Sequence, residues 1–339
     1  MSKQLHLYIA SIGSKWRRDA SATVPLGLPA LPYSVDEALD DVAACHDLGA
    51  RFFHVHSRGA NGEHIADAAW YQAFARAFRG RFPDARICFA TSRSGEVSDQ
   101  IRARENELRE RLGEMDAKLD AEGVRLACLA SDDAVELPDL LTAFTATEVR
   151  IYAEAAEIGH VAEARSSRIT RDFYHRLVAV ATAKRVLQEI EITTPESIDV
   201  VERLQQEAFL RGPVSIVLLP GFTRSFPFVP EQLAEIARRA RRVIDRNEGG
   251  GMLTLGRVLL PTTPDADEER ERFVRFAVEH PHIDAIRVGL EDAPYLDGKP
   301  ASNREIVLRT IASIERFGGA VRQSTEALPH AFGASAVAA

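Results

Sequence analysis

Eight short apolar segments alternate with helical patterns along this chain, and this alternation restricts the fold more than any other feature. The first helical pattern begins at a serine N-cap, Ser34, with Glu37 three residues later. Strands and helices that alternate eight times predict a (β/α)8 TIM barrel, and an open doubly wound sheet is the alternative. The apolar segments are residues 5–11, 51–57, 85–91, 124–130, 186–192, 214–220, 252–258 and 284–290, and the clearest helical patterns are 34–49, 229–246, 267–280 and 302–318.

The length of 339 residues suits one barrel of this kind. We expect a single catalytic domain over residues 1–330 and a flexible tail of small residues at 331–339. Two segments exceed the barrel plan. Residues 97–122 predict a highly charged, solvated helix with ion pairs between residues four apart. Residues 131–168 predict an irregular insertion that forms a lid or an oligomer contact.

Composition narrows the class of partner. A formal net charge of -8 argues against nucleic acid or an anionic membrane as the main partner. The three cysteines are far apart and form no CxxC pair, which fits a reducing, cytoplasmic location. No apolar stretch approaches the length of a membrane span.

Two histidines, His54 and His56, lie one residue apart at the end of the second apolar segment. Side chains alternate along a strand, so both histidines face one side while Phe53 and Val55 face the other. The loop "SRG" follows directly, which places the pair at the C-terminal end of its strand, the catalytic end of a barrel. This spacing suits two ligands of one metal ion, and a hydrogen-bonded histidine pair without metal is the alternative.

The last apolar segment, "DAIRVGL", leads directly into Glu291 and Asp292. Arg287, Gly289 and Glu291 alternate onto one face, so we expect Glu291 at the same rim as the histidines, with Gly289 leaving space for substrate in the lumen. In a closed barrel strand eight lies two strands from strand two. A His, His, Glu set leaves one coordination position open, as catalytic zinc sites do. A surface salt bridge between Arg287 and Asp292 is the alternative.

An amidohydrolase-type barrel also carries an HxH pair on a strand. That chemistry needs further histidines at the ends of strands five and six. The corresponding segments, "EIEITTPES" and "LLPGFTRSF", contain none. The lack of ligands excludes this class.

The segments "GARFFHVHSR", "ICFATSRSG", "VLQEIEI", "TLGRVLLP" and "IRVGLED", in this order and followed by "ASN", resemble the β-keto acid cleavage enzymes, which include 3-keto-5-aminohexanoate cleavage enzyme. The resemblance extends from about Tyr8 to Leu328. It implies a zinc-dependent (β/α)8 barrel that works as a dimer or tetramer. It also implies condensation of a β-keto acid with acetyl-CoA, which gives acetoacetate and a new acyl-CoA.

The resemblance also implies roles for individual residues. His54, His56 and Glu291 would bind zinc or another divalent metal, while Arg287 and Asp292 would hold and deprotonate the substrate. Arginine is a poor base because its pKa exceeds about 12, so we expect Asp292 to accept the proton and Arg287 to act as a clamp. Glu191 is the family's glutamate on strand five and a further catalytic candidate. Expected substrate contacts are Lys15, Thr91, Ser92, Ser131 and Arg257.

One departure from the family lies after strand one, where Lys15, Arg17 and Arg18 occur in place of an acidic or small residue. These cations predict an entrance for a substrate with an anionic far end, such as a β-keto diacid. A solvated basic turn is the alternative.

A second departure lies where we expect strand four. The family pattern "SLNxGS" is replaced by "CLASDD", so Cys128 and Ala130 lose polar contacts, and Arg93 and Ser94 replace a glycine pair after strand three. Two other functions stay open, and the changes at strand four motivate the second of them. One is a metal-dependent aldolase or retro-Claisen lyase that uses no CoA. The other is a barrel that binds metal and ligand but has lost acyl transfer.

Overall fold

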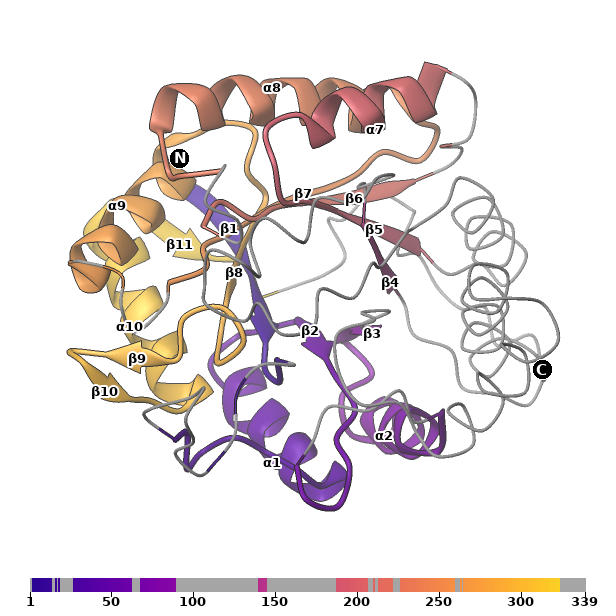
Figure 1. The fold of residues 1–339 in the computed structure, drawn as a ribbon, viewed down its shortest axis with the longest axis vertical. Coiled ribbons are helices and arrows are strands. Elements are labelled where there is room, and N and C mark those ends of the chain that lie inside the picture. The colour runs from indigo at the N-terminus through magenta and orange to yellow at the C-terminus, as the bar shows by residue number, and fades with distance from the viewer. Residues whose placement is uncertain are drawn as a thin grey trace, which may run out of the picture.

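A computed structural model shows a ring of parallel strands enclosed by helices (Figure 1). It describes residues 2–13, 16, 18, 27–62, 68–89, 140–144, 187–206, 210, 213–221, 226–259, 263 and 265–323. The ring strands are β1 (Lys3–Ala10), β2 (Phe52–Val55), β3 (Arg86–Phe89), β4 (Leu140–Phe144), β5 (Leu187–Ile192), β6 (Val214–Leu218), β7 (Gly251–Gly256) and β8 (Ala285–Val288). The helices are α1 (Val35–His46), α2 (Ala68–Arg81), α7 (Ser197–Gln206), α8 (Pro230–Arg246), α9 (Ala266–Glu279) and α10 (Asn303–Arg316).

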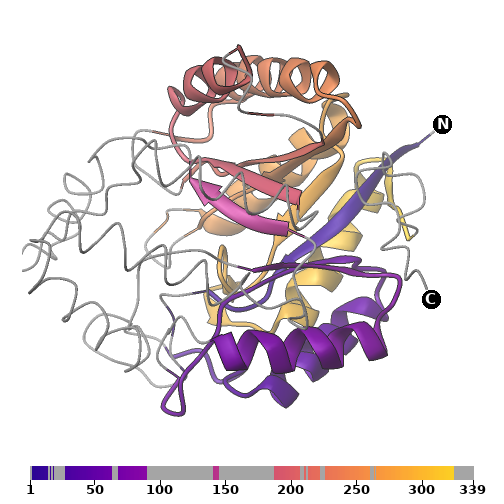
Figure 2. The ribbon, with the colours of Figure 1, turned by 90° about the vertical axis from the view of Figure 1, so that its right-hand side faces the viewer.

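The strands follow chain order around the sheet, and the sheet closes. Each of β1 to β8 pairs in parallel with the next, and β1 also pairs with β8, with Tyr8 opposite Arg287. This closure confirms the predicted TIM barrel and rules out the open doubly wound sheet. Figure 2 shows β1 extending past the ring toward the N-terminus, where β11 (Gly319–Val321) pairs with it. A small hairpin of β9 (Tyr295–Leu296) and β10 (Lys299–Pro300) follows β8.

The fourth strand is a correction to the sequence prediction. The strand between β3 and β5 is Leu140–Phe144, with Leu141 opposite both Phe89 and Gln188. The prediction had placed strand four at 124–130 and had treated 140–144 as part of an insertion. Residues 97–122, the rest of 131–168, and the expected tail at 331–339 lie outside the described residues.

Side-chain alternation separates two cores. The larger core lies between the sheet and the helices, and it takes alternate strand residues such as Phe53, Val55 and Ile190. The smaller one fills the ring itself and includes Tyr8, Phe52, Cys88, Leu187 and Met252. His54, Glu189 and Glu191 occupy the remaining inward positions of β2 and β5, because strand side chains repeat every two residues.

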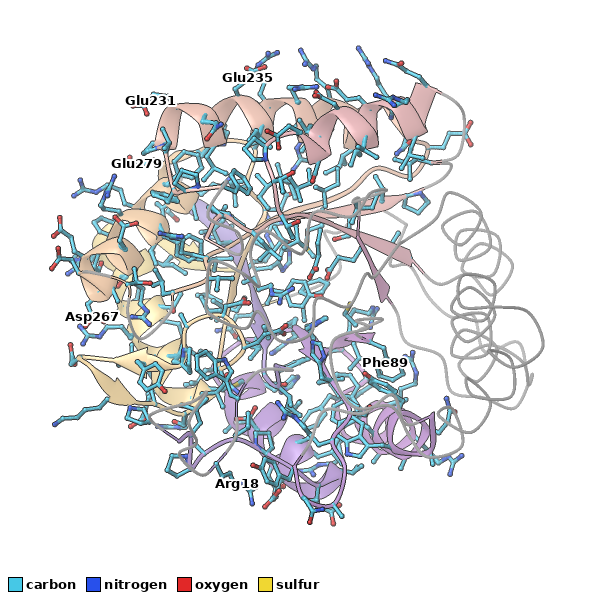
Figure 3. The ribbon with its side chains drawn as sticks, viewed as in Figure 1. Arg18, Phe89, Glu231, Glu235, Asp267 and Glu279 are labelled. Carbon is cyan, nitrogen blue, oxygen red and sulfur yellow. The ribbon has the colours of Figure 1, made fainter. Side chains whose placement is uncertain are left out.

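The helices cover the outside of the ring and are amphipathic. Figure 3 shows Glu231 and Glu235 of α8 and Asp267 and Glu279 of α9 on the outer surface. Both α1 and α10 begin with complete capping boxes, at Ser34 and Ser302 respectively. In the part of the chain that the structure describes, no helix has the length and apolar character needed to cross a membrane.

Candidate metal centre and active site

The two histidines meet inside the C-terminal mouth of the barrel. His54 lies in β2 and His56 directly follows it, and both side chains are buried. Their Nε2 atoms are 3.1 Å apart. The predicted shared face is therefore confirmed, although β2 itself ends at Val55.

Glu291 reaches the histidines from a turn rather than from a strand. Its Oε1 lies 3.2 Å from Nε2 of His56, and its Oε2 lies 3.4 Å from Nε2 of His54. The strand β8 ends at Val288, and Gly289 has a φ of +143°. A Cβ on Gly289 would lie 2.4 Å from the Ala10 carbonyl oxygen. The turn and this close approach to β1 explain the glycine, which corrects the expected role of leaving lumen space.

The main chain of Glu291 is held from the β1 side. Its N–H donates to the Ala10 carbonyl at 3.1 Å, and Trp16 Nε1 donates to the Glu291 carbonyl at 3.1 Å. Gly13 lies against the side chain, where a Cβ would be 2.6 Å from the Glu291 Cγ. Trp16 and Gly13 thus position the carboxylate, and sequence reasoning missed both.

The three side chains fit a divalent metal ion. Ligand atoms at 2.0–2.1 Å from a tetrahedral zinc lie roughly 3.3 Å apart. The two Nε2 atoms are 3.1 Å apart, and each lies 3.2 or 3.4 Å from a different oxygen of Glu291. Glu291 Oε2 is buried and makes no hydrogen bond to any described residue, although it lies 3.2 Å from Arg287 Nη2 in an ion pair. Two imidazole nitrogens and a carboxylate are a donor set that would suit a catalytic divalent metal such as zinc.

Arg287 lies beside this set with two acidic partners of its own. Its Nε donates to Asp292 Oδ2 at 2.9 Å, and its Nη2 donates to Asp292 Oδ1 at 3.2 Å. Its Nη1 donates to Glu191 Oε1 at 3.0 Å. Arg287 and Asp292 are each only 2% exposed, so the expected pairing is a buried clamp and not a surface salt bridge.

Burial and charge shift the pKa values of these groups in opposite directions. Burial raises the pKa of Glu191 to about 8, against the effect of Arg287. Burial works to raise the pKa of Glu291 too, but His56, His54 and Arg287 outweigh it and hold the pKa well below its usual range. Glu291 is therefore a carboxylate at neutral pH, whereas Glu191 keeps a proton in the metal-free chain.

The lumen contains more acidic groups than cationic ones. Among the described residues the cluster has the carboxyl groups of Glu189, Glu191, Glu291 and Asp292, with Arg287 as their cation. Ionised carboxylates are costly to bury without compensating charge. The proton on Glu191 relieves part of this cost, and a bound divalent cation would offset the negative charge that remains near Glu291.

Arg257, a predicted substrate contact that lies within the described part of the chain, does not join this cluster. Arg257 follows β7, and its Nη2 lies 3.1 Å from Glu269 Oε2, with the guanidinium carbon 5.7 Å from the Phe228 ring centre. Its role as a substrate contact stays a prediction. The structure does not describe the remaining expected contacts, which are Lys15, Thr91, Ser92 and Ser131.

The position of Arg18 corrects the expectation that it belongs to a cationic substrate entrance. Its Nε donates to the Leu31 carbonyl at 2.7 Å, and its Nη2 lies 2.6 Å from Glu37 Oε2 at the start of α1. The guanidinium also lies 4.2 Å from the Tyr33 ring centre. Figure 3 shows Arg18 at the periphery, beside α1. Arg18 therefore stabilises the start of α1 and does not contact the candidate metal ligands.

Sequence reasoning also missed Cys88 and Glu189. One ring nitrogen of His54, the Cys88 sulfur and a Glu189 carboxylate oxygen lie within 4.8 Å of one another. Glu189 precedes Glu191 by two residues in "QEIEI", so the alternation rule that paired the histidines would have placed both glutamates in the lumen.

A model of the beta-keto acid cleavage enzyme family matches residues 21–268 of the chain. The chain belongs to this family. The match includes both histidines and Glu191. It ends before β8, so Arg287, Glu291 and Asp292 of this family member are assigned to the site by geometry.

Solved structures of ObcA share the fold of this family member. One is described as a ternary complex of ObcA with a C4-CoA adduct and oxalate, at 15% identity over 87% of this chain and 66% of that chain, with a TM-score of 0.61. Another is a binary complex of ObcA with oxaloacetate, with the same identity and coverage and a TM-score of 0.62. The chain thus spans about two thirds of the ObcA chain. A search of curated protein sequences finds no match.

Proposed function

We propose that the chain is a metal-dependent enzyme that cleaves a β-keto acid by acyl exchange with acetyl-CoA, giving acetoacetate and a new acyl-CoA. The observation that carries this proposal is the convergence of His54, His56 and Glu291 directly beside the buried Arg287–Asp292 pair. Family membership supplies the reaction class, and the residues at the barrel mouth supply groups suited to each step.

His54, His56 and Glu291 would hold the metal, with zinc as the first candidate and another divalent metal as the second. When bound, the metal would polarise the keto oxygen and acidify the carbon between the two carbonyl groups. The side chain of Glu291 is 19% exposed while both histidines are nearly fully buried, so Glu291 is the most accessible of the three proposed ligands.

Asp292 is the proposed proton acceptor. Both of its oxygens accept hydrogen bonds from Arg287, which fixes the orientation of the carboxylate. The proton leaves the substrate carbon for Asp292, and the electron pair of the C–H bond makes that carbon nucleophilic. Glu191 holds Arg287 from the other side and keeps the guanidinium directed at Asp292.

The exchange balances without an oxidant or reductant. The nucleophilic carbon forms a bond to the acetyl carbon, and the CoA thiolate leaves. That thiolate then attacks the original keto carbon, whose bond to the nucleophilic carbon breaks. The carbon released in this way, which now carries the acetyl group and the substrate carboxylate, takes the proton back from Asp292 and departs as acetoacetate, while the substrate acyl group leaves on CoA.

A β-keto diacid is the proposed substrate class. Oxaloacetate, which is bound in one of the ObcA structures of the same fold, is a β-keto diacid, and a CoA adduct is bound in another. Of the three cations expected at the entrance, Arg18 is engaged by α1, which leaves Lys15 and Arg17 as candidates for the anionic end. We also propose a dimer or tetramer, which light scattering would measure.

Metal binding and turnover together test the function. We expect one metal per chain, and we expect His56→Ala to weaken metal binding by at least about 100-fold, beyond the effect of losing an outer partner. His282→Ala, a half-buried histidine ahead of β8, is the matched control and should bind metal as the unaltered chain does.

Turnover is measured as acetoacetate formed from acetyl-CoA with a panel of β-keto diacids and amino-substituted β-keto acids. We expect product that depends on both metal and acetyl-CoA. Cleavage of the acid without CoA would instead show a lyase. A metal-loaded chain that turns over no acid would show a binding protein. A preference for the amino-substituted β-keto acids would contradict the diacid assignment.

A further inference from the structure

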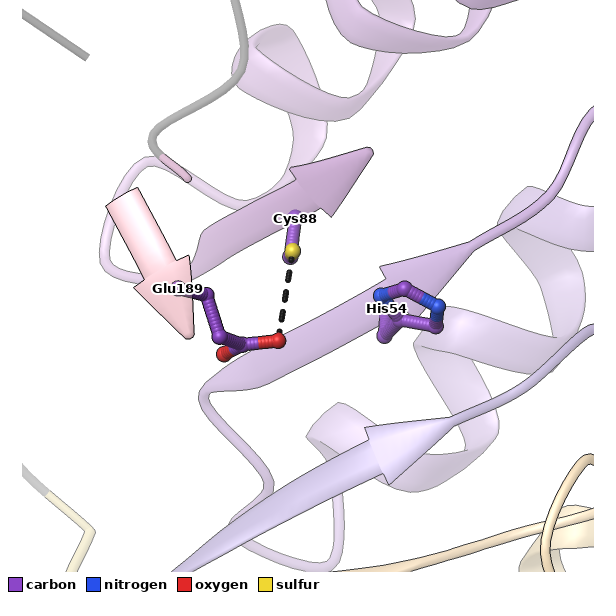
Figure 4. A group of neighbouring side chains, drawn as sticks. All are labelled: His54, Cys88 and Glu189. Carbon is purple, nitrogen blue, oxygen red and sulfur yellow. Dashed lines mark hydrogen bonds between the residues drawn. The ribbon is translucent and has the colours of Figure 1, made fainter. Parts of the chain in front are cut away.

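A second polar cluster lies beneath the proposed metal ligands, deeper in the ring. Figure 4 shows His54 of β2, Cys88 of β3 and Glu189 of β5 directed into one space from three strands. Cys88 Sγ donates to Glu189 Oε1 at 3.6 Å, and one ring nitrogen of His54 lies within 4.8 Å of both partners. His54 therefore belongs to two groups at once.

Glu189 is a buried carboxyl group whose lumen neighbours include Tyr8, Cys88 and Arg287. Its side chain is 0% exposed, and its Oε2 makes no hydrogen bond to any described residue. TIM-barrel lumens are normally filled by branched apolar side chains, so a carboxyl group at this depth is costly. Neither Cys88 nor Glu189 has a step in the proposed reaction.

The two ring nitrogens of His54 serve different sides. Its Nε2 faces His56 Nε2 at 3.1 Å and Glu291 Oε2 at 3.4 Å. A histidine that binds metal through Nε2 must carry its proton on Nδ1, and such histidines almost always give that proton to a carboxylate, carbonyl or water. Figure 4 shows a ring nitrogen of His54 on the side of Cys88 and Glu189.

We infer that Glu189, supported by Cys88, is a positioning residue that orients His54 and its Nδ1 proton so that Nε2 points at the metal. The inference rests on the metal site of the proposed function. Cys88 contacts Glu189 and so keeps the carboxylate on the His54 side of the lumen. Glu189 would act on the metal only through His54.

Three variants test this role by metal affinity, measured in competition with a chromophoric chelator. Glu189→Leu removes the acceptor but keeps the volume of the side chain, so the metal dissociation constant should rise about 10–100-fold. Glu189→Gln keeps one carbonyl acceptor, so its metal dissociation constant should lie between those of the wild-type chain and Glu189→Leu. Ser215→Ala is the matched control, because Ser215 is the register partner of Glu189 on β6 and is equally buried.

The stability of the metal-free chain separates positioning from a merely structural role. Replacing a buried polar group by an apolar one is often neutral or stabilising, so metal-free Glu189→Leu should unfold at or above the wild-type denaturant midpoint. Loss of metal affinity without loss of stability is the expected pattern. Should Glu189→Leu fail to fold, Glu189→Gln and Cys88→Ala carry the same comparison.

Cobalt substitution excludes the competing arrangement, in which His54, Cys88 and Glu189 are themselves the ligands. A thiolate ligand gives an intense charge-transfer band in the near ultraviolet. We expect no such band in the wild-type chain. A band that disappears in Cys88→Ala would overturn the inference, and so would wild-type affinity in Glu189→Leu. A wild-type chain that binds no metal would overturn the proposed metal site as well.

Discussion

Gly13 determines where the side chain of Glu291, a proposed metal ligand, can lie. It lies in the segment after β1, and the Glu291 side chain fills the space that a Cβ would need. Trp16 holds the Glu291 carbonyl from the same segment. The position of the third proposed ligand therefore depends on residues at the far end of the chain.

Gly13→Ala should displace Glu291 and weaken metal binding. The added Cβ would lie 2.6 Å from Glu291 Cγ, closer than real contacts allow, so the carboxylate has to move. We expect the metal dissociation constant to rise at least about tenfold, measured by chelator competition. Gly80→Ala in α2 is the control, because nothing lies within 4 Å of its Cβ position. That variant should bind metal normally and gain up to about 1 kcal/mol of stability. Equal affinities in both variants would contradict the prediction.

At the scale of elements, the start of α10 links three parts of the barrel mouth. Asn303 Oδ1 accepts a hydrogen bond from the Leu290 N–H at 2.8 Å, directly before Glu291. Its Nδ2 donates to the Ser11 carbonyl at 3.0 Å, after β1, and to Asp41 Oδ2 at 2.7 Å in α1. The side chain is fully buried, so each of these bonds lacks a ready replacement.

Asn303→Ala should lower both stability and metal affinity. It leaves the Leu290 N–H without its partner, which costs about 1–3 kcal/mol, and it frees the turn that carries Glu291. Ser302→Ala removes only the helix cap and should cost about 1 kcal/mol with unchanged metal binding. Urea unfolding and chelator competition measure the two effects. If both variants lose stability but keep wild-type metal affinity, Asn303 does not position Glu291 for metal binding.

For the whole molecule, buried carboxyl groups should make the stability of the metal-free chain fall as pH rises. Burial raises the pKa of Glu189 to about 7 and that of Glu191 to about 8. The unfolded chain loses these protons near pH 4.5, so the folded state holds more protons up to about pH 8. Burial lowers the pKa of His6 to about 4, which acts in the opposite direction between about pH 4 and 6.5.

The clearest window is therefore pH 6.5 to 8. There the free energy of unfolding should fall by about 2–3 kcal/mol in the metal-free wild-type chain, and buried Asp41, whose pKa burial raises to about 7, contributes to this fall with Glu189 and Glu191. Glu191→Gln should remove part of this fall, because the neutral amide does not titrate while Glu189 and Asp41 still do. Denaturant unfolding at several pH values measures the slope. A Glu191→Gln slope equal to the wild-type slope would show that Glu191 is ionised throughout.

The barrel and the histidine pair were predictable because each rests on local geometry. Seven of the eight strands lie within the predicted apolar segments or overlap them, since alternating apolar patterns are local signals. The fourth strand was misplaced for a physical reason. "VRLACLA" and "LLTAF" are both short apolar runs, and only pairing with β3 and β5 selects Leu140–Phe144. The family contrast drawn at Cys128 therefore did not concern strand four, and it no longer favours a loss of acyl transfer.

What the sequence determined by itself was the repeating unit and the shared face of His54 and His56, because a strand places every second side chain on one side. Only the tertiary structure decided that Glu291 turns onto those histidines, that Arg287 is clamped between Asp292 and Glu191, and that Glu189 lies beneath His54. Apart from the Arg287–Asp292 pair, these contacts join residues that are distant in the chain. They exist because β1 pairs with β8 and closes the ring.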